Sequence, residues 1–186
     1  IVRQDIAAQL IESLAAGRLH VVLTNELPTM TPGTRFHAHS LGETDVLLYA
    51  RADLARKLAR DFPRSLVGAP FVLPPSGAPL RRSLDAWLSE QRLDIEVRAE
   101  LDDAGLLRVF GSAGRGVFPV RAVLAAEVED LRDVRLIGRC IGVREHYYAI
   151  TSERRISHSA LSALVDSARA ELNTPVLKKK RSKRRR

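Results

Sequence analysis

The segment from Glu100 to Val120 constrains the fold of this chain most, because several local signals follow one another within it. It is expected to run from the end of a strand into a helix, then through a glycine-rich turn into a second strand. Asp102 or Asp103 can cap the helix, because a carboxylate at that position accepts the unpaired amide hydrogens of the first turn. The segment therefore predicts a strand–helix–strand unit with an acidic helix start.

The apolar face of this helix and its end follow from the next residues. Leu106, Leu107 and Phe110 have spacings that place them on one face. Pro119 is expected to stop the second strand, because proline has no amide hydrogen to donate. The residues expected to release the backbone at the end of the helix are Gly111, Gly114 and Gly116.

Apolar strands and amphipathic helices alternate along the rest of the chain. Strands are predicted over residues 19–25, 35–41, 45–50, 71–73, 94–99, 134–138 and 146–151, and helices over 5–16, 52–60, 120–131, 159–172 and from residue 80 onward. The alternation predicts an α/β fold with largely parallel sheets.

Charge and cysteine content limit the functions that are open to the chain. The 186 residues carry a net charge of +8, but the segment 178–186 alone holds eight positive side chains. The remaining 22 basic residues balance 22 acidic ones, so the folded part is predicted to lack a general basic face for nucleic acid. One cysteine, Cys140, excludes an internal disulfide and favours a reducing compartment.

Three patterns resemble chemical sites but lack part of the required geometry. The glycines at 111, 114 and 116 resemble a phosphate loop, yet they connect helix to strand, whereas the nucleotide motif connects strand to helix. His37 and His39 share a strand face, but no further ligands complete a metal site. Cys140 and His146 are too loosely associated for a nucleophile–base pair. We therefore predict no catalytic residues, no metal and no cofactor, and a protein that is not an enzyme.

Four segments together resemble the effector-binding domain of LysR-type transcriptional regulators. They lie at residues 14–24, 41–48, 74–77 and 110–119, in the order and spacing of that family. Within the family, segments 100–111, 137–139, 148–154 and 156–158 are most similar to the regulators of sodium/proton antiporter genes. The resemblance covers nearly the whole chain apart from the basic end.

The resemblance implies two Rossmann-like lobes joined by two crossover strands, as in type 2 periplasmic binding proteins. Lobe I is predicted to comprise residues 1–67 and 143–175 and lobe II residues 68–142, with a basic disordered tail at 176–186. A small molecule or an ion is expected to bind between the lobes, and the domain is expected to form homodimers or higher oligomers.

The start of the chain also carries expectations. It begins at Ile1 and shows no secretory leader, so we expect a cytoplasmic protein without membrane contacts and with further sequence upstream. The family's N-terminal winged helix-turn-helix does not occur in the sequence, so DNA binding is expected only through that absent part. The first strand and helix of the effector domain are also expected to lie upstream.

The resemblance places the effector at strand ends and helix starts in both lobes. The residues predicted to contact it are Thr24, Asn25, Glu26, Ser76, Gly77, Asp102, Asp103, Phe118 and Pro119. The alternative is that these residues are only helix caps and turn residues.

Carboxylates at the helix start suggest a further hypothesis about the effector. Asp102 and Asp103 would repel an anion, and together with Glu26 they could favour a cation or a proton-sensing role. Simple capping of the helix is the competing explanation.

The sequence favours the sensory and dimerising domain of a LysR-type regulator over two alternatives. A free-standing solute-binding protein is disfavoured by the missing leader and the single cysteine, and a two-lobed enzyme by the lack of a nucleophile or acid–base pair.

Overall fold

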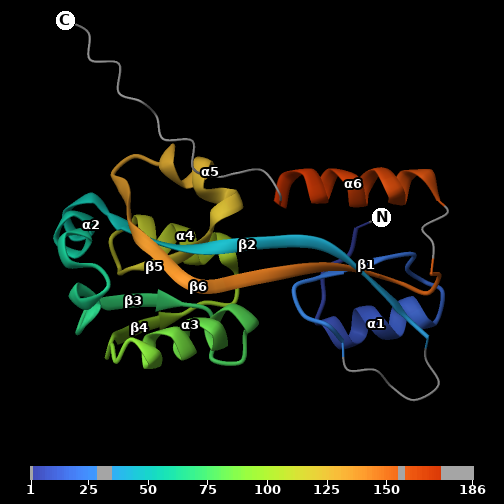
Figure 1. Ribbon diagram of the computed structural model, residues 1–186, viewed down its shortest axis with the longest axis horizontal. Coiled ribbons are helices and arrows are strands. Elements are labelled where there is room, and N and C mark those ends of the chain that lie inside the picture. The colour runs from blue at the N-terminus through green and yellow to red at the C-terminus, as the bar shows by residue number, and fades with distance from the viewer. Residues whose placement is uncertain (1, 29–34, 155–157, 173–186) are drawn as a thin grey trace, which may run out of the picture.

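Two long strands form the axis of the molecule. In a computed structural model, which describes residues 2–28, 35–154 and 158–172, β2 (His37–Arg51) and β6 (Val134–Thr151) run antiparallel along the long axis (Figure 1). They connect a smaller group of elements to a larger one. The smaller group contains α1 (Ala7–Ala15), β1 (Val22–Thr24) and α6 (Ser159–Leu172). The larger group contains α2 (Ala52–Leu58), β3 (Pro70–Leu73), α3 (Pro79–Glu90), β4 (Glu96–Glu100), α4 (Ala104–Ser112), β5 (Phe118–Arg121) and α5 (Ala125–Glu129), with short 3-10 helices at Ala59–Asp61, Arg64–Leu66 and Ala122–Leu124.

The prediction of largely parallel sheets is wrong for the main sheet. Its strand order is β1-β6-β2-β5, and every neighbouring pair is antiparallel. Among the described strands, β3 and β4 pair in parallel, and an isolated parallel bridge joins Phe71 to Val117. The predicted strands 35–41 and 45–50 belong to one strand, β2, and 134–138 and 146–151 belong to one strand, β6. Polar residues between the apolar runs hide this continuity in the sequence.

The long strands are irregular where they pass from one group to the other. The register between β2 and β6 shifts between Ser40 and Gly42, between Asp45 and Leu47, and between Leu48 and Tyr49. Such shifts bend strands and increase their twist. The two strands can therefore enter the core of each group while they remain paired.

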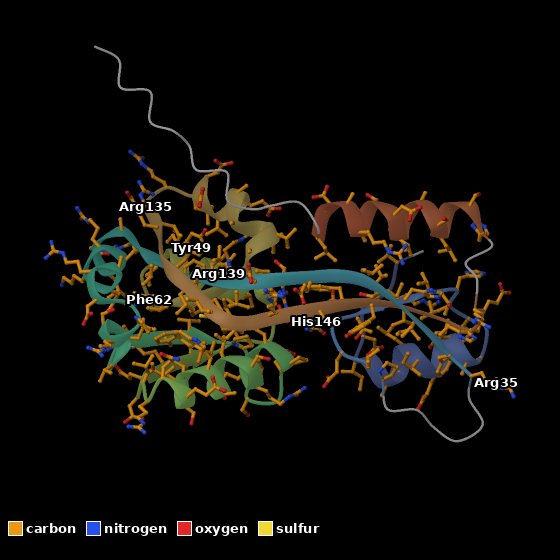
Figure 2. The ribbon with its side chains drawn as sticks, in the orientation of Figure 1. Arg35, Tyr49, Phe62, Arg135, Arg139 and His146 are labelled. Atoms are coloured by element: carbon orange, nitrogen blue, oxygen red, sulfur yellow. The ribbon has the colours of Figure 1, made fainter. Side chains whose placement is uncertain are left out.

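Side chains on β6 pair with carboxylates on β2 along the ribbon. Arg139 and His146, both labelled in Figure 2, project from β6. The Nη2 atom of Arg139 lies 2.8 Å from Oδ1 of Asp45, and Nδ1 of His146 lies 3.5 Å from Oε2 of Glu43. These contacts connect the two strands in addition to their backbone hydrogen bonds.

Helix α2 packs against elements that follow the boundary predicted after residue 67. Ala55 and Leu58 of α2 and Leu66 are buried in the same apolar cluster as Phe71 of β3 and Trp87 of α3. Residues 46–66 therefore pack with the larger group of elements, which holds most residues of the predicted lobe II.

The segment that constrains the fold most forms the predicted elements but buries a different helix face. Asp103 caps α4 as expected, since its Oδ1 accepts a hydrogen bond of 2.7 Å from the amide of Leu106. The predicted apolar face is wrong for Leu106 and Phe110, which are 51% and 40% exposed, while Leu107 is buried. Gly111 lies on the buried face one turn after Leu107 and allows β5 to approach closely.

Pro119 lies inside β5 and does not end it. It pairs with Leu48 of β2, and β5 is the outermost strand of the sheet. Proline is tolerated in such a strand because the ladder on its outer side is open. After β5, the predicted helix over 120–131 consists of a 3-10 turn at Ala122–Leu124 followed by α5.

None of the helices in the described part of the chain combines the length and apolar character needed to cross a membrane. The predicted basic tail at 176–186 lies outside the described residues.

Candidate functional site

A cavity of about 330 Å³ lies where three strands of the larger group end and two of its helices begin. Its wall contains Leu101 and Asp102 after β4, the first residues of α3 and α4, and all of β5. Of the described residues that line it, four have polar side chains: Asn25, Asp102, Arg108 and Arg121. The apolar lining residues are Pro74, Pro75, Ala78, Pro79, Leu80, Leu101, Ala104, Leu107, Phe118, Pro119, Val120, Leu124 and Val128. An apolar wall with a few polar groups is the usual composition of a small-molecule site.

Four of the nine predicted effector residues line this cavity. Asn25 reaches it from the end of β1, Asp102 from the start of α4, and Phe118 and Pro119 from β5. Asn25 is the lining residue that the smaller group of elements contributes. The structure therefore brings together one predicted residue from one side and three from the other.

The other five predicted residues do not line the cavity. Thr24 donates a hydrogen bond from its hydroxyl to the carbonyl oxygen of Glu26, at 3.0 Å. Ser76 and Gly77 are exposed in the turn before α3, and Asp103 is the cap of α4. Of the three carboxylates of the cation hypothesis, only that of Asp102 lines the cavity.

Glu26 has a different contact that crosses between the two groups of elements. Its carboxylate forms an ion pair with Arg82 of α3, which also donates to the carbonyl oxygen of Gly77. Both charged side chains are about half exposed, with values of 54% and 51%. Such exposed pairs contribute little to stability. The contact therefore links the two groups only weakly.

A polar cluster beside the cavity centres on Glu145, which contacts two lining residues and which sequence analysis did not identify. Glu145 lies on β6 and its side chain is only 3% exposed. The Nε atom of Arg121 donates to its carboxylate, and the Nη2 atom adds a second contact of 3.3 Å. Asn25 donates from Nδ2 to the same carboxylate at 3.0 Å. One buried carboxylate thus holds two cavity residues, one from each group of elements.

The environment of this cluster affects two pKa values. Burial opposes the charged form of Arg121, but Glu145 and then Tyr147 outweigh it, so the pKa of Arg121 is raised above its ordinary value. The pKa of Tyr147 is raised to about 12, first by burial and then by the charge of Glu145. Arg121 is therefore a permanent cation and Tyr147 a neutral phenol at physiological pH.

A second buried polar side chain, on the neighbouring strand β2, binds the backbone just after Arg121. Thr44 of β2 is opposite Glu145 in the sheet register and is 5% exposed. Its hydroxyl oxygen accepts a hydrogen bond of 3.2 Å from the amide of Val123, two residues after Arg121. The C-terminal end of β5 and the turn after it are thus attached to both long strands at the same level.

No local sequence pattern identifies this cluster of Arg121, Glu145 and Asn25. Glu145 and Arg121 are 24 positions apart and belong to different strands. Each looks like a surface charge next to an apolar run. Only the pairing of β6 with β2 and of β2 with β5 brings them together.

The patterns of His and Cys residues noted in the sequence form neither a metal site nor a nucleophile–base pair among the described residues. Within the part of the chain that the structure describes, no group of three or more His, Cys, Asp or Glu side chains could hold a metal ion. Cys140 is fully buried, and burial raises the pKa of its thiol to about 12. His39 contacts the hydroxyl of Thr151 at 2.9 Å, and His146 lies beside Glu43.

Known structures share this arrangement, in which two groups of elements are connected by two long paired strands. The chain superimposes on full-length CbnR bound to its target DNA with a TM-score of 0.65 and 19% identity, over 89% of this chain and 55% of that one. It also superimposes on the regulatory domain of CcmR from Synechocystis PCC6803 in complex with 2-PG, with a TM-score of 0.60 and 13% identity, over 89% of this chain and 79% of that one. The fold is therefore that of the regulatory domains of LysR-type regulators, and the predicted α/β class with a type 2 periplasmic-binding-protein-like architecture is confirmed.

The sequence comparison defines the family. Residues 1–173 match the LysR substrate binding domain, and the chain belongs to this family, as predicted. The transcriptional activator protein NhaR of Escherichia coli K12 is 27% identical over 169 residues, which are 91% of this chain and 55% of NhaR. This match confirms the predicted likeness within the family. The chain spans about half the length of the curated relatives that it matches.

Proposed function

We propose that this chain is the effector-sensing domain of a LysR-type transcriptional regulator, and that a small molecule binds in the cavity beside Arg121. The observation that supports this most directly is the position of Asn25. It lines the cavity from the smaller group of elements, while the remaining lining residues come from the larger group. A ligand in the cavity therefore contacts both groups and can favour one relative arrangement of them over another.

The division into lobes that fits this proposal lies within the long strands. We place it near Thr44 on β2 and Glu145 on β6, because residues 46–66 pack with the larger group. Since two paired strands are the main connection, a ligand that changes the contacts at this level can alter the angle between the lobes.

The relatives support a proposal for transcription control and for the partners of the whole protein. NhaR is named a transcriptional activator, and this supports regulation over catalysis and over transport of a free solute. The CbnR structure contains DNA and a chain of which this one covers 55%. We therefore propose that DNA is bound by sequence outside this domain, in the cytoplasm, by a homodimer or a higher oligomer. The small molecule bound to the CcmR regulatory domain supports a ligand site in this domain.

Filling the cavity tests the proposal. Leu124→Trp places a larger side chain at a cavity position, while Leu136→Trp makes the same change outside it, and both leucines are 37% exposed. Full-length protein is first screened for small molecules that raise its melting temperature, since a ligand that binds only the native state stabilises it. Hits are then tested with both variants and in a reporter assay of transcription.

We expect Leu124→Trp to abolish the thermal shift and the transcriptional response while Leu136→Trp retains both. Stabilising ligands that act equally on the two variants would show that the effector binds elsewhere.

A further inference from the structure

The positive side chains of the cavity already have internal partners. The Nη1 atom of Arg108 lies 3.3 Å from Oε2 of Glu127 at the exposed rim. Arg121 uses its Nε and Nη2 atoms for the carboxylate of Glu145. This is the edge of a guanidinium through which a carboxylate ligand forms its strongest, two-point contact. Glu145 therefore occupies the position that the acidic group of a ligand would take.

The negative side chain of the cavity has no such partner. Among the described residues, none forms an ion pair with Asp102, which lines the same wall. Asp103 is its neighbour at the start of α4. The positive end of this helix is thus already faced by two carboxylates, so it adds little attraction for an anion.

The start of α3 offers a weaker attraction for oxygen atoms. No side chain caps this helix, and its first residues Pro79 and Leu80 line the cavity. Free amide hydrogens of a first turn can donate to a neutral carbonyl oxygen as well as to a carboxylate, and the helix dipole adds an attraction for the carboxylate alone. The helix start therefore does not require a charged ligand.

We propose that Glu145 sets the charge selectivity of the cavity by occupying Arg121, so that the cavity takes a ligand with an apolar body and an uncharged amide-like head in preference to the corresponding carboxylate. A carboxylate that made the two-point contact with Arg121 would have to displace Glu145 and leave it buried without its cation, which is strongly unfavourable. An amide can donate to Asp102 and accept from the start of α3 without disturbing the ion pair. This inference rests on the proposed function of the cavity.

Phenylacetamide and phenylacetate test the inference because they share their shape and differ in charge. Each is titrated into the full chain and followed by NMR at the backbone amides of Val120 and Leu107, which line the cavity. We expect phenylacetamide to bind about tenfold more tightly, a ratio that corresponds to about 1.4 kcal/mol. Phenylacetate binding at the cavity with equal or higher affinity overturns the inference and leaves the cavity function standing. If neither compound shifts these resonances, the inference fails, while the proposed function of the cavity is decided separately by the screen with Leu124→Trp and Leu136→Trp.

Variants then assign the selectivity to Glu145. Glu145→Gln keeps the size of the side chain and removes its charge, so Arg121 becomes available and the preference for phenylacetamide is expected to disappear or reverse. Glu96→Gln is the matched control, since Glu96 pairs with Arg98 on the exposed strand β4 away from the cavity. An unchanged preference in Glu145→Gln contradicts the assignment.

A variant of an exposed residue provides an independent measurement if Glu145→Gln does not fold. Asp102→Asn removes the unpaired negative charge of the cavity at an exposed position. We expect it to raise the affinity for phenylacetate several-fold and to lower the affinity for phenylacetamide, because a neutral side-chain amide accepts a weaker hydrogen bond than a carboxylate does. Equal changes for both compounds would contradict the proposed charge selectivity.

Discussion

Gly111 of α4 faces the ring of Phe118 so closely that no side chain fits between them. A Cβ atom built at this position would lie 2.1 Å from Cδ1 and 2.4 Å from Cγ of the ring. Phe118 is fully buried, and its ring lies 6.3 Å from that of Tyr49. Since the ring is enclosed by other side chains, it cannot turn away without disturbing β5 and the wall of the cavity.

Two opposing contributions determine how much Gly111→Ala changes the free energy of unfolding. Alanine in place of glycine within a helix stabilises by about 1 kcal/mol, because less backbone entropy is lost on folding. Overpacking of a filled core costs about 1–3 kcal/mol and occasionally more. The overlap with Phe118 is severe, so the upper end of this range applies. We therefore expect Gly111→Ala to lower the free energy of unfolding by about 2 kcal/mol.

Urea unfolding followed by circular dichroism measures this effect, with the transition midpoint and slope recorded for each variant. Gly77→Ala is the control, because a Cβ atom there would meet nothing within 4 Å. We expect the control to stay within about 0.5 kcal/mol of the parent chain. If Gly111→Ala is as stable as the parent chain, the close packing of α4 against β5 is refuted.

Three further predictions follow from burial and charge. Arg121→Met leaves the buried Glu145 without its cation and is expected to destabilise the fold by about 3–5 kcal/mol, measured by urea unfolding; a loss below about 1 kcal/mol would contradict the role of this ion pair. The thiol of Cys140 is fully buried with a pKa near 12, so at pH 8 it should react with a thiol reagent only as fast as the protein unfolds, and rapid labelling of the native chain would contradict its burial. Deleting residues 176–186 is expected to leave the unfolding midpoint unchanged and to lower the salt concentration needed for elution from heparin, because eight positive charges are lost; a large loss of stability would show that the segment belongs to the fold.

Helices with a strong local pattern could be predicted from the sequence. Leu80, Leu84, Trp87 and Leu88 recur at helical spacing, and all are buried on α3. The helix over residues 159–172 has the predicted bounds in the structure. In both cases the signal is contained within a few turns, so local sequence is sufficient.

The helix α4 shows where the same reasoning failed. Its leucines and its phenylalanine allow more than one apolar face, and periodicity alone favours the one that contains Leu106 and Phe110. The structure buries Leu107 and Gly111, because close contact with Phe118 requires a residue without a side chain. Which face is buried was decided by the partner strand.

The sequence allowed a prediction of several residues that line the candidate site, but not of the ion pair beside it. The resemblance to the family predicted Asn25, Asp102, Phe118 and Pro119 at strand ends and a helix start, and these residues line the cavity. Whether they bind an effector stays a prediction. The pairing of Glu145 with Arg121 could not be predicted, because it depends on the register of two long strands.

The sequence alone determined the family, the α/β class and most helices, because these depend on local patterns and on motifs in a fixed order. The tertiary structure decided that the main sheet is antiparallel and that β2 and β6 are continuous. It also decided that a buried carboxylate joins the two sides of the cavity. The physical reason is the same for each of these features: they arise from contacts between residues far apart in the chain, and such contacts leave no periodic pattern in the sequence.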